Sequence, residues 1–244
     1  MAGRVALITG AAHRIGAAIA RALHDHGMNV AVHYRSSRAA AERLQDELNA
    51  ERADSAVLVQ GDLHHTGALA GLVQGALSAW GRLDALINNA STFYQTPIGS
   101  VSEEDWDDLL GTNLKAPFFL SQAAAPYLQR HHGCIVNIAD IHAERPRRAY
   151  PVYSIAKAGL VMLTKALASE LGPEVRVNAV APGAILWPEH EVDEETKRES
   201  IARTFLKRRG DPGDITRTVL FLIRDAGYMS GQVLTVDGGR SLGG

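Results

Sequence analysis

Short apolar runs alternate with longer, helix-length segments along almost the whole chain, and this alternation limits the fold more than any other feature. The strand candidates are Val5–Thr9, Asn29–His33, Ala56–Gln60, Ala85–Asn88, Cys134–Ala139, Arg176–Val180 and Val233–Val236. The helical patterns between them include Ile15–His26, Arg38–Ala50, Leu69–Trp80, Trp106–Arg130 and Tyr153–Leu171. Because strands that are buried on both faces read as continuous apolar runs, the pattern predicts a parallel sheet with helices on both sides.

A single domain is expected over residues 1–244, since no Ser-, Gly- or Pro-rich linker, composition shift or internal repeat divides the chain. The predicted class is an α/β, doubly wound sheet of about seven parallel strands, one for each strand candidate. The net charge is −2 and no uninterrupted apolar run reaches the ~18 residues of a membrane helix, so neither nucleic acid nor a membrane is an expected partner.

Cysteine usage and the start of the chain both favour a cytoplasmic protein. Cys134 is the only cysteine, which excludes an internal disulfide and suits a reducing compartment. The chain begins directly with a strand pattern rather than with a basic and then apolar leader. Ile135 and Val136 follow Cys134, so we expect a packed strand thiol rather than a reactive nucleophile.

The first strand leads into a glycine-containing turn that opens a helix. This segment contains Gly10, His13, Arg14, Ile15 and Gly16. Glycines here allow a tight turn, and they let backbone N–H groups approach a pyrophosphate at the helix N-terminus. Between a strand and a helix, the segment predicts a dinucleotide site rather than an ordinary connecting turn.

The end of the second strand indicates which dinucleotide. A site for NAD usually has an acidic residue there, about 20 residues beyond the glycines, whereas this chain has Tyr34, Arg35 and Ser36. An arginine beside hydroxyls suits the 2′-phosphate of NADP(H). The alternative, that Ser36 or Ser37 caps a helix beside a solvated arginine, is compatible with it. The residues at the ends of the third and fourth strands also lie where such a sheet binds ligands: Asp62, Leu63, Asn88, Asn89, Ala90 and Ser91.

Tyr153 and Lys157 are four positions apart in a helical pattern, so their side chains share one face. A free tyrosine titrates near ~10 and is a poor acid or base at neutral pH. A neighbouring cation would lower the pKa of the phenol and suit it to acid–base catalysis. A lone pair with this spacing is also an ordinary surface pair; the nucleotide signature is what favours the catalytic interpretation.

The stretch Leu186–Arg209 is the least regular, with an acidic run followed by a basic one. It predicts either a solvated helix or a mobile substrate lid at about residues 184–210.

The histidine pairs His64–His65 and His131–His132 raise the question of a metal. Adjacent histidines point in different directions, and no Cys or His recurs at ligand spacing, so we expect solvated loop histidines and no metal site.

Over essentially its whole length the chain resembles the short-chain dehydrogenase/reductase family. The matching residues are Thr9, Gly10, Gly16, Asp62, Asn88, Asn89, Ala90, Thr112, Asn113, Leu114, Tyr153, Lys157, Pro182, Gly183, Val236, Asp237, Gly238 and Gly239. The resemblance implies a Rossmann-like fold, a nicotinamide cofactor and commonly a homotetramer. It also implies that Pro182 and Gly183 contact the cofactor, that Lys157 binds the nicotinamide ribose, and that Asn113 anchors a water linking Lys157 to solvent.

Two departures from the usual pattern of that family are informative. Arg14 stands where most members have a third glycine, and Asp140 stands where most have a catalytic serine. A carboxylate repels a developing oxyanion, whereas a hydroxyl would donate to it. Unless it is held protonated, Asp140 therefore argues against a routine alcohol dehydrogenase.

Both departures are similar to the pteridine reductases, a branch of the same family, as is the run from Asn88 to Tyr94. The resemblance implies that Arg14 lies beside the pyrophosphate and reaches the pterin, that Ser91 binds its amino-pyrimidine side, and that Phe93 stacks on it. Tyr153 would donate a proton, and Asp140 would orient or protonate the substrate through Tyr153 or a water. Leu186 and Trp187 follow Pro182 and Gly183, where the family has its substrate loop, so Trp187 either lines the pocket or packs under the lid.

Each of these residues has an ordinary alternative: Arg14 as a surface side chain, Phe93 as core, and Asp140 as a cap of the next segment. Their coincidence with Ser91 favours an NADPH-dependent pteridine reductase, with dihydropterins as substrates and dihydrofolate and oxidised pterins as further candidates. Reduction of a C=N bond needs a hydride on carbon, which NADPH would supply, and a proton on nitrogen, which Asp140 and Tyr153 could supply or relay.

Two competing hypotheses remain from the sequence. One is an NADPH-dependent reductase of 3-oxoacyl thioesters or small ketones. The other is a non-catalytic NADP-binding sensor, which the Tyr153 and Lys157 pair disfavours.

Overall fold

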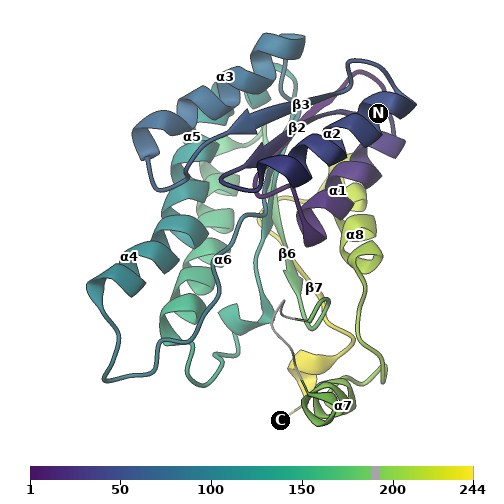
Figure 1. Cartoon of the computed structure of the whole chain (residues 1–244). Coiled ribbons are helices and arrows are strands. Elements are labelled where there is room, and N and C mark those ends of the chain that lie inside the picture. The colour runs from purple at the N-terminus through teal and green to yellow at the C-terminus, as the bar shows by residue number, and fades with distance from the viewer. Residues whose placement is uncertain (188–192, 244) are drawn as a thin grey trace.

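The computed structural model describes residues 1–187 and 193–243. Within these residues one parallel sheet contains seven strands: β1 (Val5–Ile8), β2 (Asn29–Tyr34), β3 (Ala56–Gln60), β4 (Ala85–Asn88), β5 (Cys134–Ile138), β6 (Arg176–Pro182) and β7 (Val233–Val236). The strand order is β3-β2-β1-β4-β5-β6-β7 (Figure 1). The predicted α/β class and strand positions are confirmed, with shifts of one or two residues at some strand ends.

Helices cover both faces of the sheet (Figure 1). They are α1 (Arg14–Asp25), α2 (Arg38–Glu51), α3 (Leu69–Trp80), α4 (Glu103–Leu110), α5 (Ala116–Arg130), α6 (Pro151–Leu171), α7 (Glu194–Ala202) and α8 (Pro212–Arg224). In β1, Ala6 packs into the core formed with α1, α2 and α8, whereas its neighbour Leu7 packs into the core formed with α3, α5 and α6. Because successive strand residues point to opposite faces, an entirely apolar strand supplies both cores.

The strand order reverses between β1 and β4, which are neighbours in the sheet although β2 and β3 separate them in sequence. The connections after β1 and β4 leave toward opposite faces, and this opens a crevice at the carboxyl ends of the strands. The α7 helix lies beyond the same ends of β6 and β7 (Figure 1).

The predicted helix Trp106–Arg130 is wrong as a single element. It begins at Glu103 and is interrupted by a π-helical turn, Gly111–Lys115, between α4 and α5. The Asn113 side chain donates to the carbonyl oxygen of Leu109 at 2.9 Å, so the backbone ladder widens and Ala116 N–H bonds to Gly111 O instead. The interruption places Asn113 behind the loop that carries Ser91.

Within the described residues, α6 alone is long and apolar enough to cross a membrane by length and composition. Its residues Leu160, Leu163 and Leu167 belong to the core on one face of the sheet. It also carries Tyr153 and Lys157, both almost fully buried. We therefore identify α6 as a core helix.

Candidate active site

A cavity of about 1110 Å³ extends along the carboxyl ends of the strands. Its wall includes all the predicted cofactor residues: Gly10, His13, Arg14, Ile15, Gly16, Tyr34, Arg35, Ser36, Asp62, Leu63, Asn89, Ala90, Tyr153, Lys157, Pro182 and Gly183. It also includes the predicted substrate residues Arg14, Ser91, Phe93, Asp140, Tyr153, Leu186 and Trp187. Two sets of residues that were predicted separately therefore line one continuous space.

The glycine turn after β1 is packed too closely for side chains. A Cβ atom added at Gly16 would lie 2.3 Å from the carbonyl oxygen of Gly10, and Gly10 itself has a φ of +60°. Asn89 Nδ2 donates to the carbonyl oxygens of Thr9 and Gly10, tying the turn to the end of β4. His13, the N-cap of α1, makes no side-chain cap bond to the first turn of the helix. This cradle fits a pyrophosphate.

His33 supports the same turn and was not among the predicted site residues. Gly10 N–H donates to His33 Nδ1 at 3.1 Å, so Nε2 carries the proton and donates to Gly61 O at 3.1 Å. Burial lowers the pKa of His33 to about 4, which keeps the ring neutral and able to accept. The sequence did carry a signal for this role: His33 is a polar residue near the end of an otherwise apolar strand, a position where the strand pattern predicts an apolar one.

The end of β2 presents Arg35 and Ser36 on the exposed rim of the cavity. Ser37 is the N-cap residue of α2 but makes no side-chain cap bond. The alternative that a serine caps this helix is therefore correct for the position of Ser37 but not for a hydrogen bond. Asp62 accepts a hydrogen bond from His64 N–H, which together with the nearby Arg35 charge lowers the pKa of its carboxyl group. An exposed guanidinium beside hydroxyls fits a 2′-phosphate.

Asp140 and Tyr153 are hydrogen-bonded to each other in the cavity wall. The Tyr153 hydroxyl donates to Asp140 Oδ2 at 2.8 Å. The other carboxylate oxygen, Oδ1, accepts from His142 N–H at 2.8 Å and caps a short 3₁₀ turn. The cap alternative is thus also correct, and it fixes the carboxylate so that its second oxygen faces the phenol.

The prediction that Lys157 lowers the pKa of Tyr153 is wrong. Burial first, and then the charge and hydrogen bond of Asp140, raise the pKa of the phenol well above 10. Lys157 Nζ donates to the carbonyl oxygen of Ile138 at 2.9 Å and lies 5.7 Å from the centroid of the Tyr153 ring. Burial lowers the pKa of Lys157 to about 8, against the opposing effect of Asp140. Burial and the adjacent carboxylate, neither of which the sequence could place, both favour the neutral phenol.

Phe93 lies in the cavity wall with 42% of its surface exposed, so the alternative that it is a core residue is wrong. Its ring stacks on Tyr150, with centroids 4.6 Å apart and an interplanar angle of 13°. The Tyr153 ring meets it edge-on at 4.7 Å. Arg147 lies over the Tyr150 ring, 4.6 Å from its centroid. Neither Tyr150 nor Arg147 was predicted as a site residue. In this segment only Tyr153 had a recognisable motif, its four-residue spacing from Lys157.

Ser91 and Asn113 form a hydrogen-bonded pair next to Tyr153. Ser91 Oγ donates to Asn113 Oδ1 at 2.7 Å, and Asn113 Nδ2 donates to the carbonyl oxygen of Thr92 at 3.0 Å. Asn113 is fully buried and, unlike the other predicted site residues, is not part of the cavity wall. Its observed contacts hold the Ser91 loop.

Arg14 reaches across the cavity. Its Nη2 donates to the carbonyl oxygen of Trp187 at 2.9 Å, joining the start of α1 to the segment after β6. The Arg209 guanidinium lies 5.4 Å from the centroid of the Trp187 ring. Leu186 and Trp187 both line the cavity, and the predicted lid region continues through residues 188–192, which lie outside the described residues, to α7.

The predicted loop histidines are not all solvated. His131, His132 and His65 are exposed, but His64 Nε2 lies 3.1 Å from Asp108 Oδ1 and 3.0 Å from Thr112 Oγ1. Cys134 is buried, and burial raises the pKa of its thiol to about 11, in agreement with a packed strand thiol.

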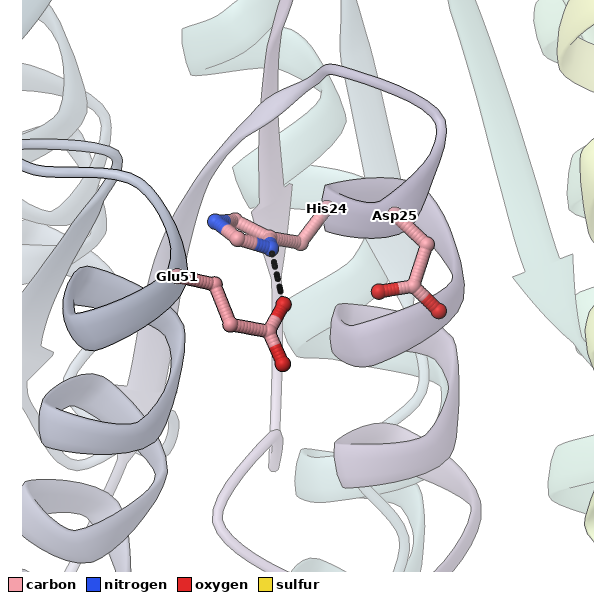
Figure 2. A group of neighbouring side chains, drawn as sticks. All are labelled: His24, Asp25 and Glu51. Atoms are coloured by element: carbon pink, nitrogen blue, oxygen red, sulfur yellow. Dashed lines mark ion pairs between the residues drawn. The ribbon is translucent and has the colours of Figure 1, made fainter.

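A different cluster, at the far end of α1 from the cavity, has the spacing of metal ligands. Atoms of His24, Asp25 and Glu51 lie within 4.8 Å of one another (Figure 2). His24 Nδ1 is 3.6 Å from Glu51 Oε2, while its Nε2 bonds to Ser55 Oγ. Asp25 and Glu51 are exposed and end their helices, where water is available to both carboxylates. The cluster takes no part in the cavity.

Comparisons with known proteins cover almost the whole chain. A family described as enoyl-(acyl carrier protein) reductase matches residues 10–241. The 3-oxoacyl-(acyl-carrier-protein) reductase FabG of Staphylococcus aureus is 36% identical over 238 residues, which span 96% of this chain and 96% of that protein. Pteridine reductase 1 of Leishmania tarentolae is 35% identical over 281 residues, with 98% and 96% covered. An uncharacterized oxidoreductase of Methylorubrum extorquens is 35% identical over 243 residues, with 97% of each covered.

Proposed function

Because the chain belongs to the short-chain dehydrogenase/reductase family and is an oxidoreductase, we propose that it is an NADPH-dependent pteridine reductase, which converts dihydropterins to tetrahydropterins. One observation carries the proposal: a carboxylate, Asp140, is hydrogen-bonded to the Tyr153 hydroxyl beside the exposed ring of Phe93. Dihydrofolate and oxidised pterins are further proposed substrates.

The Asp140–Tyr153 pair favours reduction of C=N over C=O. Reduction of a ketone builds negative charge on oxygen, and a neighbouring carboxylate raises the energy of that charge. Reduction of a C=N bond instead leaves a basic nitrogen that takes up a proton. A phenol whose proton is already shared with Asp140 at 2.8 Å can pass it to that nitrogen and be reprotonated through the carboxylate.

The cofactor half of the cavity supports NADPH as the reductant, which when bound supplies a hydride. The Gly10–Gly16 turn would hold the pyrophosphate, and Arg35 with Ser36 would hold the 2′-phosphate. Lys157 uses one of its three donors on the Ile138 carbonyl oxygen, which leaves others for the hydroxyls of the nicotinamide ribose.

The substrate half supports a flat, nitrogen-rich ring. Tyr150 covers one face of Phe93, so a pterin would stack on the other, which contributes about 0.5–1.5 kcal/mol beyond area burial. Ser91 directs its proton to Asn113, and its oxygen, which has two lone pairs, would accept from an amino group on the ring. Asn113 acts in this proposal by positioning Ser91 and, following the family, by holding a water near Lys157.

A second candidate, a reductase of 3-oxoacyl thioesters, is favoured by the 36% identity to FabG. That activity depends on a hydroxyl donor where this chain has Asp140. The two candidates therefore make opposite predictions for the same substitution.

The test measures NADPH oxidation with dihydrobiopterin and with an acetoacetyl thioester. We expect turnover of dihydrobiopterin, and a fall in its kcat/KM of about 100-fold in Asp140→Ser, a typical contribution of one proton-transfer group. Asp46→Ser, on the exposed side of α2, is the matched control. Good NADPH binding without pterin turnover would end the proposal, and thioester turnover that improves in Asp140→Ser would establish the second candidate.

A homotetramer in the cytoplasm completes the proposal. The α5 and α6 helices expose apolar side chains that a second copy could cover: Phe118, Phe119, Ile155 and Met162. Light scattering on the purified protein measures the mass, and a monomer would exclude the assembly.

A further inference from the structure

Three arginines from separate segments meet at the substrate end of the cavity: Arg147 before α6, Arg203 at the end of α7, and Arg240 after β7. All three line the same space as Phe93 and Asp140. None belongs to the proposed hydride- or proton-transfer steps, so their presence there needs another explanation.

Arg147 borders the aromatic stack. Its guanidinium carbon lies 5.6 Å from the centroid of Phe93 as well as above Tyr150. Stacking on these rings holds the guanidinium plane while its N–H groups remain available at the edge. A molecule stacked on Phe93 would therefore have a fixed cation at one end of its ring.

Arg240 is positioned by hydrogen bonds to Ser200. Its Nη1 donates to the carbonyl oxygen of Ser200 at 2.7 Å and to Ser200 Oγ at 2.9 Å. Burial, followed by repulsion from Arg203 and Arg147, lowers the pKa of Arg240, and the opposing attraction of Asp140 and Asp237 does not cancel this shift.

Few carboxylates neutralise this trio. Among the residues that the structure describes, the trio makes one ion pair, between Arg203 Nη2 and Glu199 Oε2 at 3.9 Å, and both of these side chains are exposed. Asp140 is bonded to Tyr153 and His142, and Asp237 accepts from the N–H groups of Gly239 and Ser241. Converging cations of this kind raise the local concentration of an anion and bind it.

We propose that Arg147, Arg203 and Arg240 form an anion subsite for the tail of the substrate, so that the enzyme prefers pterins with a carboxylate or phosphate on the side chain to pterins with a neutral one. The inference rests on the proposed function, because stacking on Phe93 determines where the tail begins. A guanidinium binds either anion through charge-assisted hydrogen bonds, so the chemistry is shared by carboxylate and phosphate.

The test compares kcat/KM for three substrates: dihydrobiopterin with its neutral side chain, dihydrofolate with two carboxylates, and dihydroneopterin monophosphate. In Arg147→Gln and in Arg240→Gln, the ratio of the anionic substrate to dihydrobiopterin should fall about tenfold, the effect of one charged hydrogen bond. Added salt should lower the same ratio in the wild type. A preference for dihydrofolate identifies a carboxylate, and one for the monophosphate identifies a phosphate.

Arg148→Gln is the control, because Arg148 is the exposed neighbour of Arg147 and does not line the cavity. NADPH binding by each variant shows that it is folded. The subsite is refuted if the ratio of kcat/KM for the anionic substrate to that for dihydrobiopterin is unchanged in Arg147→Gln and Arg240→Gln, or falls equally in Arg148→Gln. In either case, turnover of dihydrobiopterin would still support the proposed function. A wild type that binds NADPH but does not reduce dihydrobiopterin refutes the proposed function, and the subsite with it.

Discussion

The two halves of the cavity are built in different ways. The nucleotide half is made of backbone held at close range: Gly16 lies against Gly10, which is hydrogen-bonded to the side chains of Asn89 and His33. The substrate half is made of side chains from distant segments, such as Phe93, Asp140 and Arg240. Backbone N–H groups serve any dinucleotide, whereas side chains choose a substrate. This difference explains why relatives with two different names are almost equally similar to the chain, at 36% and 35% identity.

The largest effect is expected in the backbone half, where there is no space for change. In Gly16→Ala the new Cβ would lie 2.3 Å from the Gly10 carbonyl oxygen, and relieving that overlap must displace the turn. We expect the Kd for NADPH to rise about 100-fold, since an overpacked site typically loses about 1–3 kcal/mol. Titration of NADPH fluorescence measures it. Gly71→Ala in α3, where an added Cβ meets nothing within 4 Å, is the control, and equal affinities in the two variants would contradict a closed cradle.

A smaller effect is expected where the halves meet, at Lys157. Burial lowers the pKa of this amine from 10.5 to about 8, so the ammonium is present below that pH and is lost above it. The kcat/KM should therefore fall about tenfold for each pH unit above about 8. Tyr153 does not contribute in this range, because its pKa is raised well above 10.

Lys157→Arg tests that assignment, because a guanidinium stays protonated throughout the range. Its activity, whatever the level, should lose the alkaline fall. A fall that persists unchanged in this variant would assign the titration to another group.

The smallest effect is expected on the exposed rim of the nucleotide half. Arg35→Gln should lower the preference for NADPH over NADH about fivefold, because a solvated ion pair contributes only about 1 kcal/mol. The ratio of kcat/KM for the two cofactors measures it. Arg38→Gln, an exposed α2 arginine paired with Glu42, is the control. An unaltered ratio in Arg35→Gln would show that the 2′-phosphate is held elsewhere.

Local patterns in the sequence predicted much of the fold. Apolar runs located β3, β4 and β7 with the observed bounds, and Leu69–Trp80 is the observed α3. The same approach failed for the predicted helix Trp106–Arg130. There a side-chain bond from Asn113 to the backbone carbonyl of Leu109 outweighs helix propensity, and no periodicity reports such a bond.

Within the site, the sequence by itself marked the glycine turn and the Tyr153–Lys157 pair, because each is a property of one short segment. The tertiary structure alone decided how they act on one another. It buried Tyr153 and placed Asp140 against its hydroxyl, and together these reversed the expected shift of the phenol's pKa. It also stacked Tyr150 on Phe93 and brought three arginines from separate segments into the cavity that Phe93 lines. Electrostatic and stacking interactions depend on distances of a few ångströms between segments far apart in the chain, and only the folded backbone sets those distances.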